Sequence, residues 1–158
     1  MRRWACMACA VAVVAVASAV GAATVRVEGG TDRSCLVWRQ GGVVECFGSD
    51  KELDARSAEL ASAHVARSLS CVTSLDVWAA SGFSGTHLRF WDEGVWINLA
   101  DYGFDEQLSS YYGGACSFYM AEDAWGGGAW YPGDTGPYAS SSFVGWDWND
   151  RISSLYIA

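Results

Sequence analysis

The chain carries one sequence pattern twice, 42 residues apart (position 78 against position 120). In each copy an aromatic slot is followed by four residues, an aromatic residue, one further residue and a glycine. The pattern residues are Trp78, Phe83 and Gly85 in the first copy and Met120, Trp125 and Gly127 in the second. Each copy leads to a serine pair, which ends at Ser110 or Ser154, 25 or 27 residues after the glycine. Repetition at this period predicts two copies of one supersecondary unit.

The spacing has a physical reason in a strand that folds back on itself. Such a bend needs a backbone position with positive φ, which glycine adopts without steric cost. We therefore predict positive φ at Gly85 and Gly127, with Phe83 and Trp125 covering the bends. A hydroxyl both donates and accepts a hydrogen bond, so the last serine of each copy is predicted to bond to the bend of its own copy.

The first 23 residues are predicted to be a secretory signal peptide. A short basic start, residues 1–3, precedes an almost wholly apolar run over residues 5–20, and small residues follow that run. This order is typical of a signal peptide, with cleavage between Ala19 and Thr24. Because the run is short for a membrane-spanning helix, an uncleaved anchor is the weaker alternative. We expect a secreted protein with no membrane contact after cleavage.

The charge of the chain argues against nucleic acid as a partner. Without Arg2 and Arg3 of the signal peptide, 8 of the 10 basic side chains remain against 18 acidic ones, and the basic ones are scattered singly. Phosphate backbones need clustered cationic groups. An acidic exported chain instead suits solubility and divalent cations.

Four cysteines remain after the signal peptide, and an even count in an exported protein predicts two disulfides. They are Cys35, Cys46, Cys71 and Cys116. Three pairings are possible. Cys35 and Cys46 flank a Gly41-Gly42 turn and suit a cross-strand bridge, which would leave Cys71 with Cys116. A zinc site is the disfavoured alternative, because no Cys-x-x-Cys spacing occurs among these four cysteines.

Composition divides the rest of the chain into residues 24–70 and residues 71–158. The first part predicts a small hairpin-plus-helix module, with the helix over about residues 50–67 begun by a capping box of Ser49 and Glu52. Its expected strands are 24–27, 35–39 and 43–47. The second part, rich in Gly, Ser and aromatic residues, predicts an all-β sandwich of Greek keys. Its strand candidates are 75–78, 87–91, 95–99, 117–120, 129–131 and 154–157.

The seven tryptophans of residues 71–158 are mostly predicted to be core, because large aromatic side chains supply the most buried area in a small domain. That interpretation is favoured for Trp78, Trp125 and Trp148. Trp130, which lies between Gly128 and Pro132, is expected to be exposed.

At these residues the chain resembles the βγ-crystallin superfamily. Its folded hairpin reads aromatic-x4-aromatic-x-Gly with a distal serine, and its microbial members carry a calcium signature, Asn/Asp-Asn/Asp-x-x-Ser/Thr-Ser. Residues 149–154 (NDRISS) match this signature at every position, whereas residues 105–110 (DEQLSS) depart at Glu106. The resemblance implies a double Greek key over residues 71–158.

The resemblance also implies calcium, because each site of that superfamily draws ligands from both keys. Calcium takes six to eight oxygen ligands, and the two signature segments offer carboxylate, amide and hydroxyl oxygens. The candidate ligands are Asp105, Glu106, Ser109, Asn149, Asp150 and Ser153. Asp, Asn and Ser are also the usual residues of turns, so simple turn chemistry is the alternative.

A narrower resemblance points to protease inhibition. Residues 71–85 (CVTSLDVWAASGFSG) and the stretches around both signatures are similar to secreted actinobacterial metalloproteinase inhibitors, which share the crystallin fold. Those proteins often carry a second cysteine where this chain has Asp76. The resemblance implies a secreted metalloprotease as partner, met by a loop of a rigid domain at low ordering cost. The candidate loops are Asp92–Gly94 and Gly126–Tyr138.

Two other function classes remain to be weighed. A binding or structural module for an envelope polymer, a carbohydrate or another protein is the alternative, with aromatic stacking around Trp130, Tyr131 and Tyr138. An enzyme is disfavoured, because the adjacent acids Asp92 and Glu93 would point to opposite faces of a strand. No Ser–His–Asp order, phosphate loop or metal-binding His spacing occurs either. We expect a monomer.

Overall fold

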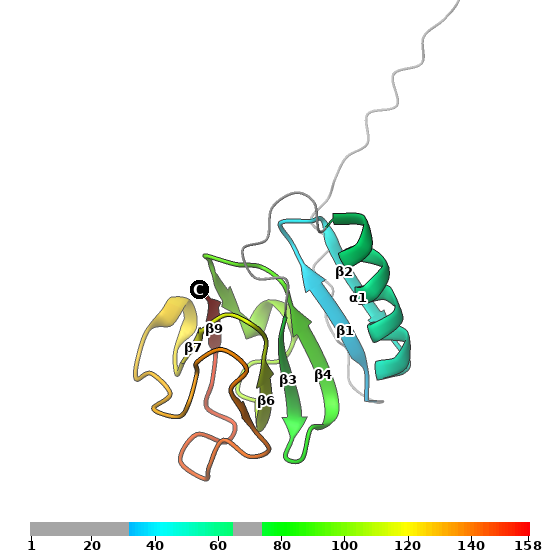
Figure 1. The fold of residues 1–158 in the computed structure, drawn as a ribbon. Coiled ribbons are helices and arrows are strands. Elements are labelled where there is room, and N and C mark those ends of the chain that lie inside the picture. Colours follow the sequence, from blue (N-terminus) through cyan, green and yellow to red (C-terminus); the bar gives the residue numbers. More distant parts are fainter. Residues whose placement is uncertain (1–31, 65–73) are drawn as a thin grey trace, which may run out of the picture.

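The computed structural model describes residues 32–64 and 74–158. The predicted signal peptide, the predicted strand at 24–27 and Cys71 lie outside the described residues. Figure 1 shows two β-sheets, the larger of which includes the N-terminal hairpin, and a helix that packs on that hairpin. In chain order the elements are β1 (Ser34–Trp38), β2 (Val43–Phe47), α1 (Asp50–His64), β3 (Leu75–Ala80), β4 (Ser84–Phe90), β5 (Trp96–Asn98), the 3-10 helix η1 (Leu99–Tyr102), β6 (Ser110–Gly113), β7 (Phe118–Ala121), the 3-10 helix η2 (Ala124–Gly126), β8 (Ser140–Ser141) and β9 (Ser154–Ile157).

The two sheets are built from two interlocked four-segment units. The larger sheet has the order β2-β1-β4-β3-β6-β8, and the smaller has the order β5-β9-β7. The first unit, β3 to β6, gives its third strand β5 to β9 of the second unit. The second unit gives β8 to β6 of the first in return. Each Greek key therefore completes the sheet of the other.

Some predicted strands differ from the observed ones. Residues 129–131 make a single bridge, Trp130 to Ala121, and no strand. The sequence does not predict β6 or β8. β8 has only two residues, and both are serine. Such a short polar segment carries no alternation that could identify it.

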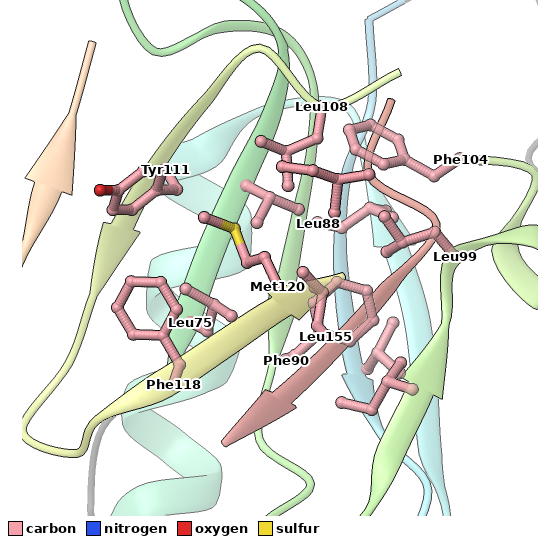
Figure 2. Close-up of a cluster of buried hydrophobic side chains, with 14 of the residues drawn as sticks. Leu75, Leu88, Phe90, Leu99, Phe104, Leu108, Tyr111, Phe118, Met120 and Leu155 are labelled. Carbon is pink, nitrogen blue, oxygen red and sulfur yellow. The ribbon is translucent and has the colours of Figure 1, made fainter. Parts of the chain in front are cut away.

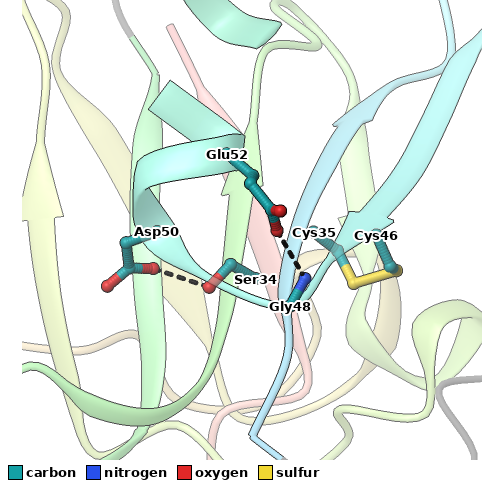
Figure 3. Close-up of a disulfide and its surroundings, with 6 residues drawn as sticks. All are labelled: Ser34, Cys35, Cys46, Gly48, Asp50 and Glu52. Carbon is teal, nitrogen blue, oxygen red and sulfur yellow. Dashed lines mark hydrogen bonds between the residues drawn. A yellow bond between two sulfur atoms is a disulfide. The ribbon is translucent and has the colours of Figure 1, made fainter. Parts of the chain in front are cut away.

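The N-terminal hairpin extends the larger sheet. β1 and β2 pair antiparallel with Cys35 opposite Cys46, and a disulfide joins these two residues (Figure 3). β1 also pairs in parallel with β4, from Ser34 opposite His87 to Val37 opposite Phe90. The predicted Cys35–Cys46 bridge is thereby confirmed. Cys116 is also in a disulfide, and the partner predicted for it, Cys71, lies outside the described residues.

Helix α1 begins where the capping box predicts, but the cap differs in one contact. The amide of Glu52 donates to the hydroxyl of Ser49 at 3.4 Å. The carboxylate of Glu52 accepts from the amide of Gly48 at 3.1 Å rather than from Ser49 (Figure 3). Leu53 and Leu60 of the helix are buried against Leu36 of β1, which seats α1 on the hairpin.

The main core lies between the two sheets (Figure 2). Alternate residues of each strand point inward, since successive side chains of a strand face opposite sides. Leu75, Leu88 and Phe90 come from the larger sheet, and Phe118, Met120 and Leu155 from the smaller. All six are buried to 1% exposure or less. Full burial of each such side chain contributes about 1.5–3 kcal/mol to folding.

Both bends are held by the serines that the repeat predicts. In the first key the Ser110 hydroxyl donates to the carbonyl of Ala80 at 2.7 Å and accepts from the amide of Phe83 at 3.2 Å. In the second key the Ser154 hydroxyl donates to the carbonyl of Asp123 at 2.6 Å. It also accepts from the amide of Gly126 at 3.0 Å. Ser110 and Ser154 are fully buried, so these bonds are shielded from water.

The structural repeat is offset by one residue from the sequence pattern. Trp78 lies opposite Ser110, but Ala121 rather than Met120 lies opposite Ser154. The left-handed positions shift in the same way. Gly82, Phe83 and Gly85 of the first bend correspond, 43 positions later, to Trp125, Gly126 and Gly128, and all six have φ between 58° and 81°.

Gly127 therefore does not have the role predicted for it. Its φ is −75°, which any residue adopts. The space at this position is tight, because a Cβ would lie 3.2 Å from Ala124 O and from Asp123 Cβ. Met120 points into the core instead of occupying the outer aromatic slot.

The same offset decides which aromatic side chain covers its bend. Phe83 packs edge-on against Trp78, with centroids 5.3 Å apart, and so covers the first bend. Trp125 falls at the position of Gly82 and is 68% exposed, so the expectation that it is core is wrong. Trp130 is exposed as expected, while Trp148 packs against the main core.

A buried ionic cluster joins α1 to the larger sheet. His87 of β4 is 2% exposed, and its ring nitrogens lie 2.6 Å from carboxylate oxygens of Asp50 and Asp76. The imidazole ring stacks on Trp78 at 4.3 Å. Arg89 donates to the same Asp76 oxygen at 2.7 Å. The clamp formed by Asp50, His87, Asp76 and Arg89 thus ties the start of the helix to β3 and β4.

Candidate metal centre between the two keys

The two signature segments lie against each other across the interface of the keys. The amide of Glu106 donates to the carbonyl of Ile152, and the amide of Asp150 donates to the carbonyl of Leu108, both at 3.3 Å. The two bonds are equivalent. Glu106 and Asp150 hold the second position of their signatures, and Leu108 and Ile152 hold the fourth. Each acidic residue is therefore placed next to the serine pair of the opposite key.

The first serine of each pair is buried beside the bend of its own key. Ser109 is 5% exposed, its amide donates to Trp78 O at 2.9 Å, and its hydroxyl donates to Ala79 O at 3.0 Å. Ser153 is 9% exposed, and its amide donates to Ala121 O at 3.0 Å. Backbone bonds thus bring Asp150 beside Ser109 at one candidate site.

The second candidate site brings Glu106 beside Ser153 in the same way. Both acidic residues are exposed and have left-handed backbones, with φ of 53° for Glu106 and 57° for Asp150. Asp adopts this region more readily than Glu, since its short side chain bonds locally. A sparsely populated conformation repeated at equivalent positions of both keys points to a functional constraint.

The remaining candidate ligands are Asn149 and Asp105. The side-chain Nδ2 of Asn149 donates to a carboxylate oxygen of Asp150 at 2.6 Å, which orients that carboxylate. Asp105 is exposed. Within residues 32–64 and 74–158 no three His, Cys, Asp or Glu side chains are grouped as a metal site. Calcium here would depend on hydroxyl, amide and backbone oxygens and water around one carboxylate, a donor set that calcium accepts.

Of three comparisons with known proteins, one found similar chains. No protein-family model matches the chain, and no curated protein matches it. Among solved structures it is similar to a βγ-crystallin from Ciona intestinalis, with 18% identity over 54% of this chain and 99% of that chain and a TM-score of 0.46. A βγ-crystallin domain from Clostridium beijerinckii is 14% identical over 54% of this chain and 97% of that chain, with a TM-score of 0.45. The N-terminal domain of protein S is 17% identical over 54% of this chain and 96% of that chain, with a TM-score of 0.45.

The decisive features are those of this chain itself. Two Greek keys exchange their third strands, and a buried distal serine holds each bend. This is the βγ-crystallin fold. The crystallin domain carries the hairpin and helix as an addition at the β4 edge of its larger sheet. The narrower likeness to metalloproteinase inhibitors stays a prediction.

The positively charged side chain of Arg151 lies beside the second candidate site, formed by Glu106 and Ser153. The guanidinium of Arg151 forms an ion pair with Glu122, donates to Asp147 O and lies 5.4 Å from the centroid of the Trp148 ring. The hydrogen bond from Arg151 lowers the pKa of Glu122. Glu122 follows Ala121, which bonds Ser153, so positive charge borders the Glu106–Ser153 site and disfavours calcium there.

Neither Glu122 nor Arg151 was a sequence candidate. Arg151 occupies the first variable position of its signature, where Gln107 stands in the other copy. A positively charged residue within an otherwise acidic and polar signature is the feature of the sequence that could have identified Arg151. Of the two candidate sites, the one formed by Asp150 and Ser109 therefore lies farther from this positive charge.

The buried clamp described above resembles catalytic chemistry only in its residue types. Ser34 and His87 both bond to Asp50, at 2.6 Å each, so the carboxylate lies between the hydroxyl and the imidazole. A nucleophilic serine would need the imidazole as its direct partner. Burial raises the pKa of Asp50, but the hydrogen bonds from Ser34 and His87 outweigh it and hold the pKa below its usual value. The cluster is built as a structural tie.

The two loops considered for protease contact differ sharply. Asp92 is 1% exposed, and its carboxylate accepts from the amides of Arg39 and Gln40 at 2.9 and 2.7 Å. The amide of Gly94 donates to Ile157 O. Asp92 thus anchors the β1–β2 turn, whereas Gly94 at the other end of this loop is exposed.

The loop over residues 126–138 keeps part of its surface open. Trp130 and Tyr138 are 53% and 64% exposed. Tyr131, by contrast, packs edge-on against Tyr111 and against Trp148 of the core. The aromatic patch expected from Trp130, Tyr131 and Tyr138 is therefore not one surface.

Proposed function

We propose that this protein is an exported crystallin-type domain that binds calcium between its keys. The observation that carries the proposal is the pair of crossing bonds from Glu106 and Asp150, which set each acidic residue beside the buried serine of the other key. Export is supported by the signal sequence and by the Cys35–Cys46 disulfide, since disulfides persist in oxidising compartments. No described helix is long and apolar enough to cross a membrane.

Calcium would tighten a fold that already exists. The core, the Cys35–Cys46 disulfide and the bends held by Ser110 and Ser154 include none of the six candidate calcium ligands. Extracellular modules bind calcium with Kd values of about 10⁻⁴ to 10⁻³ M. At millimolar calcium such a site adds about 0.4–1.4 kcal/mol to the free energy of unfolding.

Millimolar calcium is therefore expected to raise the melting temperature by a few degrees over the value in EDTA. Asp150→Ala should remove most of this rise, because the site formed by Asp150 and Ser109 would lose its carboxylate. Differential scanning calorimetry of the full chain in EDTA and in about 10 mM calcium, roughly 10 to 100 times the Kd range above, measures the effect.

The matched control is Asp101→Ala. Asp101 carries the same charge, lies on the surface in an ion pair with Arg39, and belongs to neither signature. That variant should keep the full calcium response. Identical melts in calcium and EDTA for the unmodified chain would refute the proposal, as would an equal loss of response in the Asp101 and Asp150 variants.

Inhibition of a secreted metalloprotease is a second candidate. The exposed Trp130 and Tyr138 of the 126–138 loop favour it, because that loop follows Cys116, which is in a disulfide, and a loop held in place loses little free energy on binding. Titration of a thermolysin-like protease with the purified protein is expected to reduce proteolysis at micromolar concentration. Tyr138→Ala should weaken the inhibition, while Tyr112→Ala, which is 48% exposed on β6, should not. Full protease activity at micromolar protein would remove this candidate.

A further inference from the structure

The outer face of the smaller sheet bears a closed group of aromatic rings. Trp96 of β5, Tyr156 of β9 and Tyr119 of β7 point away from the core on adjacent strands, and Trp130 lies over the edge. Neighbouring centroids are 5.4–6.2 Å apart around the group. Trp130 and Tyr119 are 53% and 38% exposed, so their surfaces remain open to solvent. We call these four residues the aromatic face.

The rings of the aromatic face are held in place without a ligand. The indole nitrogen of Trp130 donates to Gly126 O at 2.8 Å, which fixes the ring over the sheet. Trp96 lies directly on Gly126, where a Cβ would be 2.3 Å from ring carbons. A ligand meeting fixed rings loses little free energy to ordering them.

The four rings carry no charge. Asn98 and Ser154 on the same side of the sheet are buried and bond to the η2 bend. The Glu122 carboxylate, which accepts from the Ala129 amide next to Trp130, is paired with Arg151. The whole chain, by contrast, has a net charge of −8. A neutral ligand suits this surface, and an anionic polymer would be repelled by the rest of the molecule.

The open area is too small for a stable protein partner. A large aromatic side chain offers about 150–250 Å², so the exposed parts of Trp130 and Tyr119 together offer roughly 200 Å². A stable protein interface needs about 800 Å² on each side. The area therefore fits a narrow ligand that touches a few rings, rather than a second copy of the chain.

We propose that the aromatic face binds a single chain of a neutral, β-1,4-linked polysaccharide. Pyranose rings with equatorial hydroxyls present flat C–H faces that stack on aromatic rings, while the tyrosine hydroxyls can bond the sugar hydroxyls. The four rings are tilted by 42–64° to one another. This twisted surface fits a chain that turns along its length and not the flat face of a crystalline polymer.

The experiment titrates the full chain with cellohexaose and with the hexamer of N-acetylglucosamine, followed by calorimetry. One of the two is expected to bind saturably and equally in calcium and in EDTA, because the face shares no residue with the calcium site. Trp130→Ala should weaken that binding about tenfold or more, since it removes the most exposed ring. Trp146→Ala is the matched control, because Trp146 is 88% exposed beside Phe143 in another loop.

Folding of the variants is checked by circular dichroism, and Tyr119→Ala serves as the second variant if Trp130→Ala does not fold. The inference is overturned if neither hexasaccharide binds, or if Trp146→Ala weakens binding as much as Trp130→Ala. Binding of a proline-rich peptide in place of both sugars would also overturn it. Loss of the calcium response leaves these outcomes unaffected, so the two proposals fail separately.

Discussion

Replacing Asp76 by alanine is expected to lower the free energy of unfolding by about 3–5 kcal/mol. Asp76 is 4% exposed, and one of its oxygens accepts from both His87 and Arg89. Its other oxygen accepts from Ser74 at 2.9 Å. Removing the carboxylate leaves a buried imidazole and a largely buried guanidinium without their shared partner, which costs far more than losing a surface ion pair.

Asp54→Ala is the control for that measurement. Asp54 pairs with the same Arg89 at 2.8 Å, but its side chain is 63% exposed. Its removal should cost about 0–1 kcal/mol. Urea denaturation of both variants, followed by tryptophan fluorescence, gives the two values. Similar losses in the two variants would show that the clamp is not the strong contact that its burial indicates.

Ser110→Ala is expected to cost about 2–4 kcal/mol, the second largest effect. The hydroxyl is fully buried and serves two backbone groups, the Phe83 amide and the Ala80 carbonyl. Without it both groups lose a partner inside the fold, and each unsatisfied group costs about 1–3 kcal/mol. Ser154→Ala should behave alike, since Ser154 holds the second bend with the same pair of contacts.

The matched variant for the serines is Ser84→Ala in the same first bend. The Ser84 hydroxyl donates to Ser81 O in an exposed position, so its loss should stay within about 0.5 kcal/mol. The same denaturation experiment applies. A Ser110 variant as stable as the Ser84 variant would mean that the bend is held by its glycines alone.

The repeat in the sequence predicts the fold because its glycines and serines are the residues that a bent strand requires, for positive φ and for hydrogen bonds to the bend. The serine pairs end at Ser110 and Ser154, the two residues that hold the bends. The pattern misplaces the second bend by one residue, however. It selects Trp125 and Gly127 by residue type, whereas the backbone uses Gly126 and Gly128. Three consecutive glycines satisfy either register, so only the pairing of Ala121 with Ser154 decides between them.

Long-range contacts account for what the sequence could not predict. Asp50, Asp76 and His87 lie in three elements and meet only because β1 runs parallel to β4 and brings α1 alongside. No local periodicity encodes that pairing. The aromatic face is similar, because Trp96 and Tyr119 lie on strands that are joined only through β9. The candidate calcium ligands, in contrast, lie within two contiguous signatures, and the sequence marks them directly.

The position of β9 has a consequence for the timing of folding. β5 and β7 do not pair with each other, and each pairs with β9, whose residues are 154–157. The smaller sheet therefore has no native strand pair until that segment has left the ribosome. Closure of the sandwich therefore waits for β9, which also supplies Leu155 and Ile157 to the main core.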